Sequence, residues 1–326
     1  MLTKTSFLFV ELNFLTMKKI KFLGTMSLAA MLLFSACSKE DEIAGQSSFA
    51  AENNEELLKM GKQKLEVNIS GLEPPGNDYR YEGWIIVNGQ PISTGTFKIT
   101  PNGNMAPKVF VVDSDDLAGA TTFVLTIEPH PDPDPAPSDH KILAGDFSGS
   151  TANLSVGHMA ALGDNFMSAT GGYILATPTT ATMDDEKSGV WFINNTSGSP
   201  MPGLSVPTLP MGWIYEGWAV INGIPVTTGK FLEEDMADMA APYSGPLAGP
   251  PFPGEDFVMN APMGLSFPTD LSGDKIVVTI EPNPDNDPMP FFLKPLAGDV
   301  AANAMAHTTY FMMNLSSTFP TGTVVR

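Results

Sequence analysis

The sequence predicts an all-β protein built from two tandem β-sandwich (Ig-like) domains, and three observations lead to this prediction. Glycine and proline are abundant, with 30 and 29 residues of 326, and such a composition favours turn-rich β structure over helix bundles. Short runs in which apolar and polar residues alternate occur along much of the chain, as in half-buried strands. The third observation is an internal duplication, which predicts one structural unit for each copy.

The duplication consists of two matched stretches. Residues 81–97 (YEGWIIVNGQPISTGTF) match residues 215–231 (YEGWAVINGIPVTTGKF), and residues 126–146 match residues 279–299. The spacing between copies is 134 for the first pair and 153 for the second, so the second copy carries a 19-residue insertion. We place the insertion within Leu232 to Pro268, where the two copies are expected to differ most in what they bind.

The first copy contains the clearest turn signal of the chain. Asn88-Gly89 separates two apolar runs, residues 79–87 and 92–99, and both central residues of a type I′ turn need positive φ. We therefore predict a β-hairpin whose returning strand starts after Pro91 or lies at a sheet edge. A single helical turn is expected at residues 113–120. The other strands predicted in this copy are residues 65–69, 110–112, 123–127 and 141–146.

Residues 155–200 have no partner copy. Two strands are predicted there, at residues 173–177 and 189–193, joined by the acidic turn Met183-Asp184-Asp185-Glu186. These strands either close the first sandwich or open the second, and the sequence leaves both choices open.

The predicted domain boundaries follow from these patterns. Residues 197–202 are the best boundary between the copies, which gives a first β-sandwich at residues 64–198 and a second at residues 199–326. Residues 37–63 are rich in Glu, Asn, Ser and Ala and are predicted to form a flexible acidic tether.

A lipoprotein signal peptide is predicted at residues 1–36, with Met17 as the true start. Lysines follow Met17 directly, and the apolar run that comes next is too short to span a bilayer. The run ends in Leu33-Phe34-Ser35-Ala36-Cys37, which resembles a bacterial lipobox. Cys37, the single cysteine, is therefore the predicted lipid-attachment residue, and a chain with one cysteine forms neither an intramolecular disulfide nor a Cys-based zinc site.

The residues after Cys37 bear on location and partners. Ser38-Lys39-Glu40-Asp41-Glu42 resembles the acidic export signal of surface lipoproteins in Bacteroidetes-type bacteria. We expect an outer-membrane lipoprotein exposed on the cell surface, with the periplasmic face as the alternative. The net charge of -19 argues against a nucleic-acid partner, because phosphate binding needs clustered Lys and Arg. The expected partners are the membrane, through the lipid anchor, and an unknown extracellular or periplasmic ligand.

The two repeated motifs also carry a family resemblance. Tyr-Glu-Gly-Trp with a downstream Asn-Gly-x-Pro, and Thr-Ile-Glu-Pro with its Pro/Asp loop, resemble the extracytoplasmic C-terminal domain of anti-sigma-K factors, in a tandem form found in surface proteins of Bacteroidetes. The resemblance covers most of residues 64–326 and implies a β-sandwich. Family members hold the sigma factor with a cytoplasmic N-terminal domain. Only 16 residues precede Met17, so we expect the ligand-facing module alone and no direct contact with a sigma factor.

Four repeated residues are the candidates for ligand binding: Glu82, Trp84, Glu216 and Trp218. The two glutamates are also candidates for the acid and base of a glycosidase, which needs two carboxylates about 5–9.5 Å apart. Glu128 and Glu281 recur as well, and the simpler interpretation is that the repeated glutamates pair with Lys141 or Lys294. Each tryptophan either stacks on a sugar or belongs to the core of a sandwich, and we favour the core.

The paired Pro/Asp loops hold the weak candidates for a metal site, namely Asp132, Asp134, Asp285 and Asp287. Carboxylates two residues apart supply the hard oxygens that Ca²⁺ prefers, but an EF-hand loop is missing from the sequence, and a rigid solvated turn is the favoured interpretation. We predict no cofactor beyond this option. The many methionines are interpreted as core filler rather than as a copper site.

We therefore predict a non-enzymatic, lipid-anchored binding or sensing protein without a sigma-binding domain. One alternative is an envelope regulator of the anti-sigma type that acts through a partner. A second is a glycan-active enzyme that uses Glu82 and Glu216.

Overall fold

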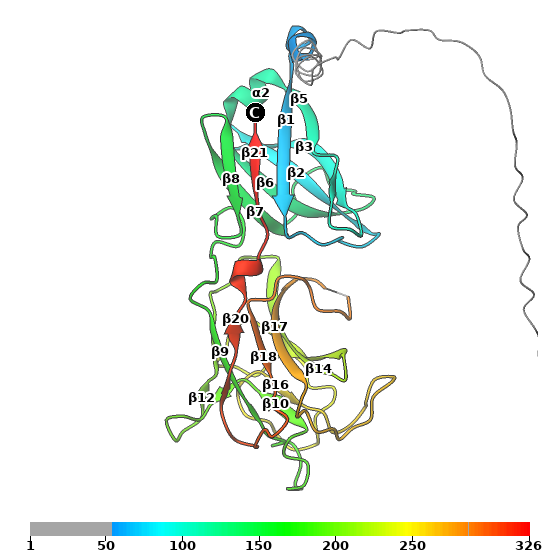
Figure 1. Ribbon diagram of the computed structural model, residues 1–326, viewed down its shortest axis with the longest axis vertical. Coiled ribbons are helices and arrows are strands. Elements are labelled where there is room, and N and C mark those ends of the chain that lie inside the picture. The colour runs from blue at the N-terminus through cyan, green and yellow to red at the C-terminus, as the bar shows by residue number, and fades with distance from the viewer. Residues whose placement is uncertain (1–53, 286) are drawn as a thin grey trace, which may run out of the picture. The chain divides into compact units, whose positions relative to one another are not determined.

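Nearly all the regular structure in the computed structural model is β (Figure 1), which confirms the predicted all-β class. The structure describes residues 54–326 except residue 286. The predicted signal peptide, Cys37 and most of the tether lie outside the described residues. Where the chain is described, it contains no helix long and apolar enough to cross a membrane.

The first half of the chain and the last strand together build a nine-stranded sheet in the order β4-β3-β2-β6-β7-β8-β21-β1-β5. One short helix, α2 (Ser114–Gly119), lies at the predicted place and is capped by the Asp113 side chain, which accepts a hydrogen bond from the Asp115 amide. We call this sheet and helix the first lobe. Its strands are β1 (Lys62–Ser70), β2 (Tyr79–Val87), β3 (Gln90–Ile99), β4 (Met105–Ala106), β5 (Val109–Asp113), β6 (Ala120–Pro129), β7 (Lys141–Ser148), β8 (Thr151–Ser155) and β21 (Thr321–Val325).

Residues 156–320 form two five-stranded sheets and one two-stranded sheet, which we call the second lobe. One five-stranded sheet has the order β15-β14-β17-β18-β20, and the other contains β13, β9, β10 and β16 with β19 paired to β9. The strands are β9 (Thr170–Leu175), β10 (Gly189–Trp191), β11 (Ile193–Asn194), β12 (Met201–Pro202), β13 (Leu204–Ser205), β14 (Trp213–Ile221), β15 (Ile224–Phe231), β16 (Gly254–Asp256), β17 (Lys275–Pro282), β18 (Leu296–Asp299), β19 (Tyr310–Phe311) and β20 (Met313–Asn314).

The strand pairing differs from the sequence-based boundary at residues 198/199 in two ways. β9 and β10, which precede that boundary and whose unit the sequence left open, pair with β13, β16 and β19 of the second lobe. The last strand, β21, pairs with both β8 and β1 of the first lobe (Figure 1). The second lobe is thus inserted in the sequence between two neighbouring strands of the first lobe.

The repeated motif YEGW has the same structure in both lobes. A β-bulge falls between Gly83 and Trp84 in β2, and again between Gly217 and Trp218 in β14. Each glycine is needed because a side chain would collide: a Cβ on Gly217 would lie 2.1 Å from the Thr228 hydroxyl oxygen. The hairpin turns also repeat, since the asparagine and glycine of both Asn-Gly pairs have positive φ, as a type I′ turn requires.

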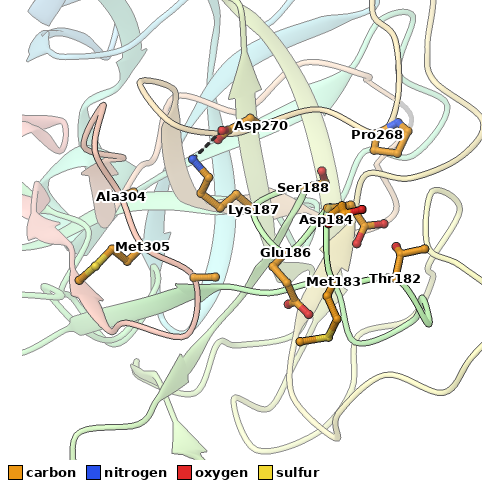
Figure 2. A pocket seen from close by; sticks show the side chains of 12 residues that line it. Thr182, Met183, Asp184, Glu186, Lys187, Ser188, Pro268, Asp270, Ala304 and Met305 are labelled. Atoms are coloured by element: carbon orange, nitrogen blue, oxygen red, sulfur yellow. Dashed lines mark ion pairs between the residues drawn. The ribbon is translucent and has the colours of Figure 1, made fainter.

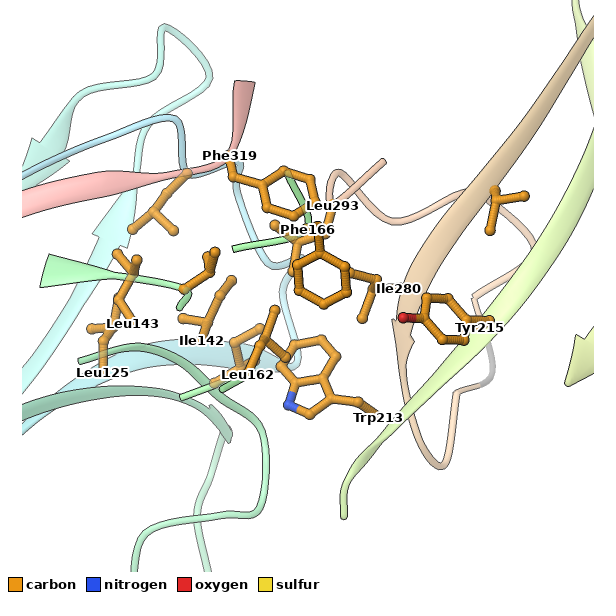
Figure 3. Packing of buried hydrophobic residues seen from close by; sticks show 14 of the residues in the cluster. Leu125, Ile142, Leu143, Leu162, Phe166, Trp213, Tyr215, Ile280, Leu293 and Phe319 are labelled. Atoms are coloured by element: carbon orange, nitrogen blue, oxygen red, sulfur yellow. The ribbon is translucent and has the colours of Figure 1, made fainter. Parts of the chain in front are cut away.

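A continuous group of buried apolar side chains joins the two lobes (Figure 3). Ile142 and Leu143 of β7 belong to it, as do Trp213 of β14 and Ile280 of β17. Phe319, two residues before the start of β21, packs edge-on against Phe166 with ring centroids 5.6 Å apart. The approach to the last strand is therefore anchored in the same core as the strands of the second lobe.

The interpretation of the methionines as core filler is wrong. Of the fifteen methionines in the described residues, only Met105 is buried, and Met312 is half-buried against the core. The thirteen exposed ones are Met60, Met159, Met167, Met183, Met201, Met211, Met236, Met239, Met259, Met263, Met289, Met305 and Met313. All of them except Met60 lie in the second lobe.

Candidate functional site

The repeated tryptophans are buried in the structure. Trp84 and Trp218 are 3% and 2% exposed, and neither indole offers a face on which a sugar could stack. Each indole N–H donates a hydrogen bond of 2.8 Å to a threonine hydroxyl, that of Thr126 in the first lobe and that of Thr279 in the second. In each lobe, the tryptophan of the Tyr-Glu-Gly-Trp motif is thus bonded to the threonine of the Thr-Ile-Glu-Pro motif. The burial of both tryptophans agrees with the prediction that they are core residues.

Glu82 and Glu216 follow the same repeated pattern. The Ser93 hydroxyl donates to Glu82, and the Thr227 hydroxyl donates to Glu216. Glu216 is only 4% exposed, and Lys230 Nζ lies 3.7 Å from its Oε2. Because Glu82 is in the nine-stranded sheet and Glu216 is in a sheet of the second lobe, the structure gives no support to a glycosidase pair made of these two residues.

Glu128 and Glu281 close the Pro/Asp loops. Glu128 accepts the Ser138 amide and Glu281 accepts the Phe291 amide, each at 2.9 Å, from across the loop. The Lys141 ion pair is with Asp139, so the expected pairing of these glutamates with Lys141 is wrong. Burial raises the pKa of both glutamates, and it raises the pKa of Glu281 to about 7.

The four loop aspartates serve the backbone. Asp132 accepts the Asp134 amide, and Asp134 accepts the Ala136 amide; Asp285 and Asp287 repeat this arrangement. Asp285 also forms an ion pair of 2.9 Å with Lys230. Within residues 54–326, with residue 286 left aside, no three His, Cys, Asp or Glu side chains gather as a metal site would need. The repeated residues thus hold the fold, and a binding site is better sought where the copies differ.

A large open pocket lies in the second lobe, in segments without a partner copy. It has a volume of about 890 Å³ and is lined by residues 182–188 and 304–306, together with Pro268 and Asp270. Figure 2 shows the lining side chains, with the ion pair between Lys187 and Asp270 at one side. The lining contains four carboxylates and one lysine, so the pocket is acidic.

Hydrogen bonds hold the acidic wall of the pocket in place. Asp185 accepts the hydroxyls of Thr177 and Thr180 at 3.1 and 3.2 Å. Glu186 accepts the Thr177 amide and lies 3.1 Å from His307 Nε2. Asp184 forms no hydrogen bond or ion pair with another described residue, and its side chain is exposed. It is therefore the carboxylate most available to a ligand.

A buried aspartate anchors this wall to the sheet. Asp256 of β16 accepts the Thr179 amide at 2.8 Å and the indole N–H of Trp191 at 2.7 Å. A Cβ on Gly189 would lie 2.3 Å from Asp256 Oδ1, so the strand opposite must carry glycine at this position. Burial raises the pKa of Asp256.

Two more carboxylates, the buried Glu255 and the half-buried Asp238, hold the insertion against β16. Glu255 accepts the Ser244 hydroxyl and the Tyr243 amide, and Asp238 accepts the Gly254 amide at 2.9 Å. Burial raises the pKa of both Glu255 and Asp238 to about 7. The insertion is thus not a free loop but a segment fastened to the sheet that supports the pocket.

Comparison with known proteins addresses the first lobe. Residues 57–141 match the family model described as anti-sigma-K factor rskA, C-terminal. The matched segment runs from before β1 to the first residue of β7 and so contains Glu82, Trp84 and Glu128. It ends before the pocket. No curated protein and no solved structure matches the chain.

Sequence reasoning missed the pocket. Its signal was present in the acidic turn at residues 183–186, which we interpreted only as a connection between strands. The rest of the lining comes from Pro268, Asp270 and residues 304–306, which lie far along the chain. No local sequence pattern predicts that these segments meet residues 182–188.

Proposed function

We propose that this protein is a non-enzymatic, extracytoplasmic binding or sensing protein whose second lobe binds a cationic ligand in the acidic pocket. The observation that carries the proposal is the pocket itself, about 890 Å³ in volume, with four carboxylates against a single lysine. Asp184 is free to contact a ligand, while Asp185 and Glu186 are held by hydrogen bonds and present a preorganised negative wall.

The lining also limits the kind of cation. Met183 and Met305 border the pocket and are well exposed, so aliphatic groups find thioether partners beside the carboxylates. A lysine side chain or a polyamine combines an ammonium group with a methylene stem and meets both requirements. We favour binding over catalysis because the repeated carboxylates are engaged in hydrogen bonds that close loops and join strands.

Replacing Asp184 with asparagine is expected to weaken the binding of tetralysine without changing thermal stability. The substitution removes one unpaired charge from the pocket, and an exposed charge of this kind contributes roughly 0.2–1 kcal/mol, which is about a one-and-a-half- to fivefold change in Kd. Calorimetric titration at low salt measures it. Asp235→Asn removes the same charge from an exposed position outside the pocket lining and is the matched control. Equal affinities for the two variants, or no binding by the unchanged protein, would count against the pocket.

The cellular location is a further part of the proposal. The support is the lipobox-like sequence that ends at Cys37 and the acidic residues that follow it. We expect protease added to intact cells to remove the protein, and Cys37→Ala to release it from the membrane fraction, because acyl chains supply the anchor. Cleavage only after the outer membrane is opened would place the protein on the periplasmic face instead.

The family match favours a second candidate function, a regulator of the anti-sigma type that acts through a partner. In this reading the first lobe contacts the partner and the second lobe senses the ligand. Deleting the gene and finding sigma-dependent transcription unchanged would argue against this function and leave the binding function standing.

A further inference from the structure

Most methionines in the part of the chain that the structure describes lie on its surface. Thirteen of the fifteen in the described residues are exposed, with Met263 at 98% and Met159 at 85%. Methionine is normally among the more buried residue types, because water is a poor solvent for its apolar side chain. Loop positions on the surface rarely need methionine, so core packing does not explain why this surface carries so many thioethers.

The exposed methionines are spread over many separate segments rather than gathered at one place. Met167 precedes β9, Met211 precedes β14, Met239 lies in the insertion, and Met289 lies in the second Pro/Asp loop. Met313 is in β20. A docking surface would concentrate apolar side chains on one contiguous patch. Methionines distributed over many loops are instead suited to react with a small solute that reaches the protein from all sides.

We propose that the second lobe is an oxidant sink, in which surface methionines consume peroxide without loss of the fold. Each thioether sulfur attacks one peroxide oxygen, and the S–O bond forms as the O–O bond breaks. The transferred oxygen loses its proton, and the departing hydroxide gains one to become water. Sulfur is oxidised by two electrons, peroxide is reduced by two, and the sulfoxide stays on the chain until a reductase removes it.

The burial pattern allows this chemistry without structural damage. A sulfoxide is polar, and forming one inside a core disrupts packing. Met105 is buried, and Met312 is half-buried and packs against the core. The reactive thioethers already contact water, so a polar sulfoxide replaces few apolar contacts there. The methionines that react are thus separate from those that pack in the core, as a protein that consumes oxidant and stays folded requires.

The test is to treat the full chain with excess hydrogen peroxide, count the oxygen atoms added at each site by peptide mass spectrometry, and follow unfolding by circular dichroism. We expect oxygen at the thirteen exposed methionines, less at the half-buried Met312 and none at Met105, and an unfolding temperature within a few degrees of the untreated protein. The matched variant replaces five of the most exposed side chains with glutamine: Met159, Met167, Met183, Met211 and Met263. It should take up five fewer oxygen atoms.

Protection of a second molecule completes the experiment. A co-dissolved peptide with one methionine should be oxidised more slowly beside the unchanged protein than beside the five-site variant. Equal protection by the two proteins would overturn the proposal, as would cooperative unfolding while oxygen is added. If the methionines form a contact surface between copies, their reactivity will fall as protein concentration rises, and that result too would overturn it.

Discussion

Removal of the last six residues, Thr321 to Arg326, is expected to unfold the first lobe. β21 is an interior strand of the nine-stranded sheet, and it pairs along five positions with β8 and along five with β1. Without it, β8 and β1 each lose one of their two partners, and the sheet is cut in two. Val324 is fully buried in the core, so the deletion also removes apolar contacts.

The terminal residue adds to this effect. The Arg326 guanidinium donates to the carbonyls of Leu117 at 2.6 Å and Ala120 at 2.8 Å, and it lies 4.4 Å above the Phe147 ring. These contacts tie the end of helix α2 to the last strand. Losing them together with the strand is expected to cost at least the 5–15 kcal/mol that typically stabilises a folded domain.

Thermal unfolding followed by circular dichroism, with limited proteolysis of residues 62–155, measures the result. Arg326→Ala is the graded control, because it keeps the strand and is expected to cost only about 1–3 kcal/mol from its hydrogen bonds to carbonyls. A truncated chain that keeps its unfolding temperature and its resistance to protease would show that the first lobe does not depend on β21.

The elements predicted correctly from the sequence are those with local signals. The hairpin around Asn88-Gly89 is marked by a turn whose backbone only such residues adopt readily, and β1 and β6 are marked by alternation. β21 lacks both kinds of signal, because the strand has only five residues and its partner strands, β8 and β1, lie far back in the chain. The place of β9 and β10 was left open for the same reason, because pairing between distant strands is decided by the whole core.

The candidate site was predictable only in part. Trp84 and Trp218 recur beside Glu in strands, and the interpretation as core residues agrees with their burial. The exposure of the methionines was not predictable from residue type, because a flexible thioether is compatible with both core and surface. The carboxylates that hold the insertion, such as Glu255, were not predicted, because no sequence pattern distinguishes a buried acidic residue from an exposed one.

Replacing Glu281 with glutamine is expected to stabilise the protein strongly at pH 8 and much less at pH 5. Glu281 is 1% exposed, and desolvation is the main cause that raises its pKa from 4.5 to about 7. Glu216 and Asp285 add negative charge nearby, and Lys230 offsets it only in part. The ionised carboxylate is therefore unfavourable in the folded protein.

The sign of the pH dependence follows from the raised pKa. Well below pH 4.5 the carboxyl is protonated in both the folded and the unfolded chain, and its ionisation has no effect on stability. Between 4.5 and 7 the folded chain holds the proton more tightly, so the free energy of unfolding falls as pH rises. Above about pH 7 the loss is complete and amounts to roughly 3–4 kcal/mol for this one group. Glu255 and Asp238 act in the same direction.

Glutamine carries no ionisable group, so it removes this loss of stability at high pH while it keeps the hydrogen bonds that the side chain accepts. The Thr279 hydroxyl and the Phe291 amide both donate to one oxygen of Glu281, and an amide oxygen accepts them equally well. Urea unfolding at pH 5 and pH 8 measures the difference. Glu128→Gln makes the matching change in the first lobe, where the carboxyl also has a raised pKa, and a gain at pH 8 is expected there too. If Glu281→Gln instead lowers stability at pH 8, the carboxylate charge itself is favourable, and its interaction with Lys230 outweighs the cost of burying it.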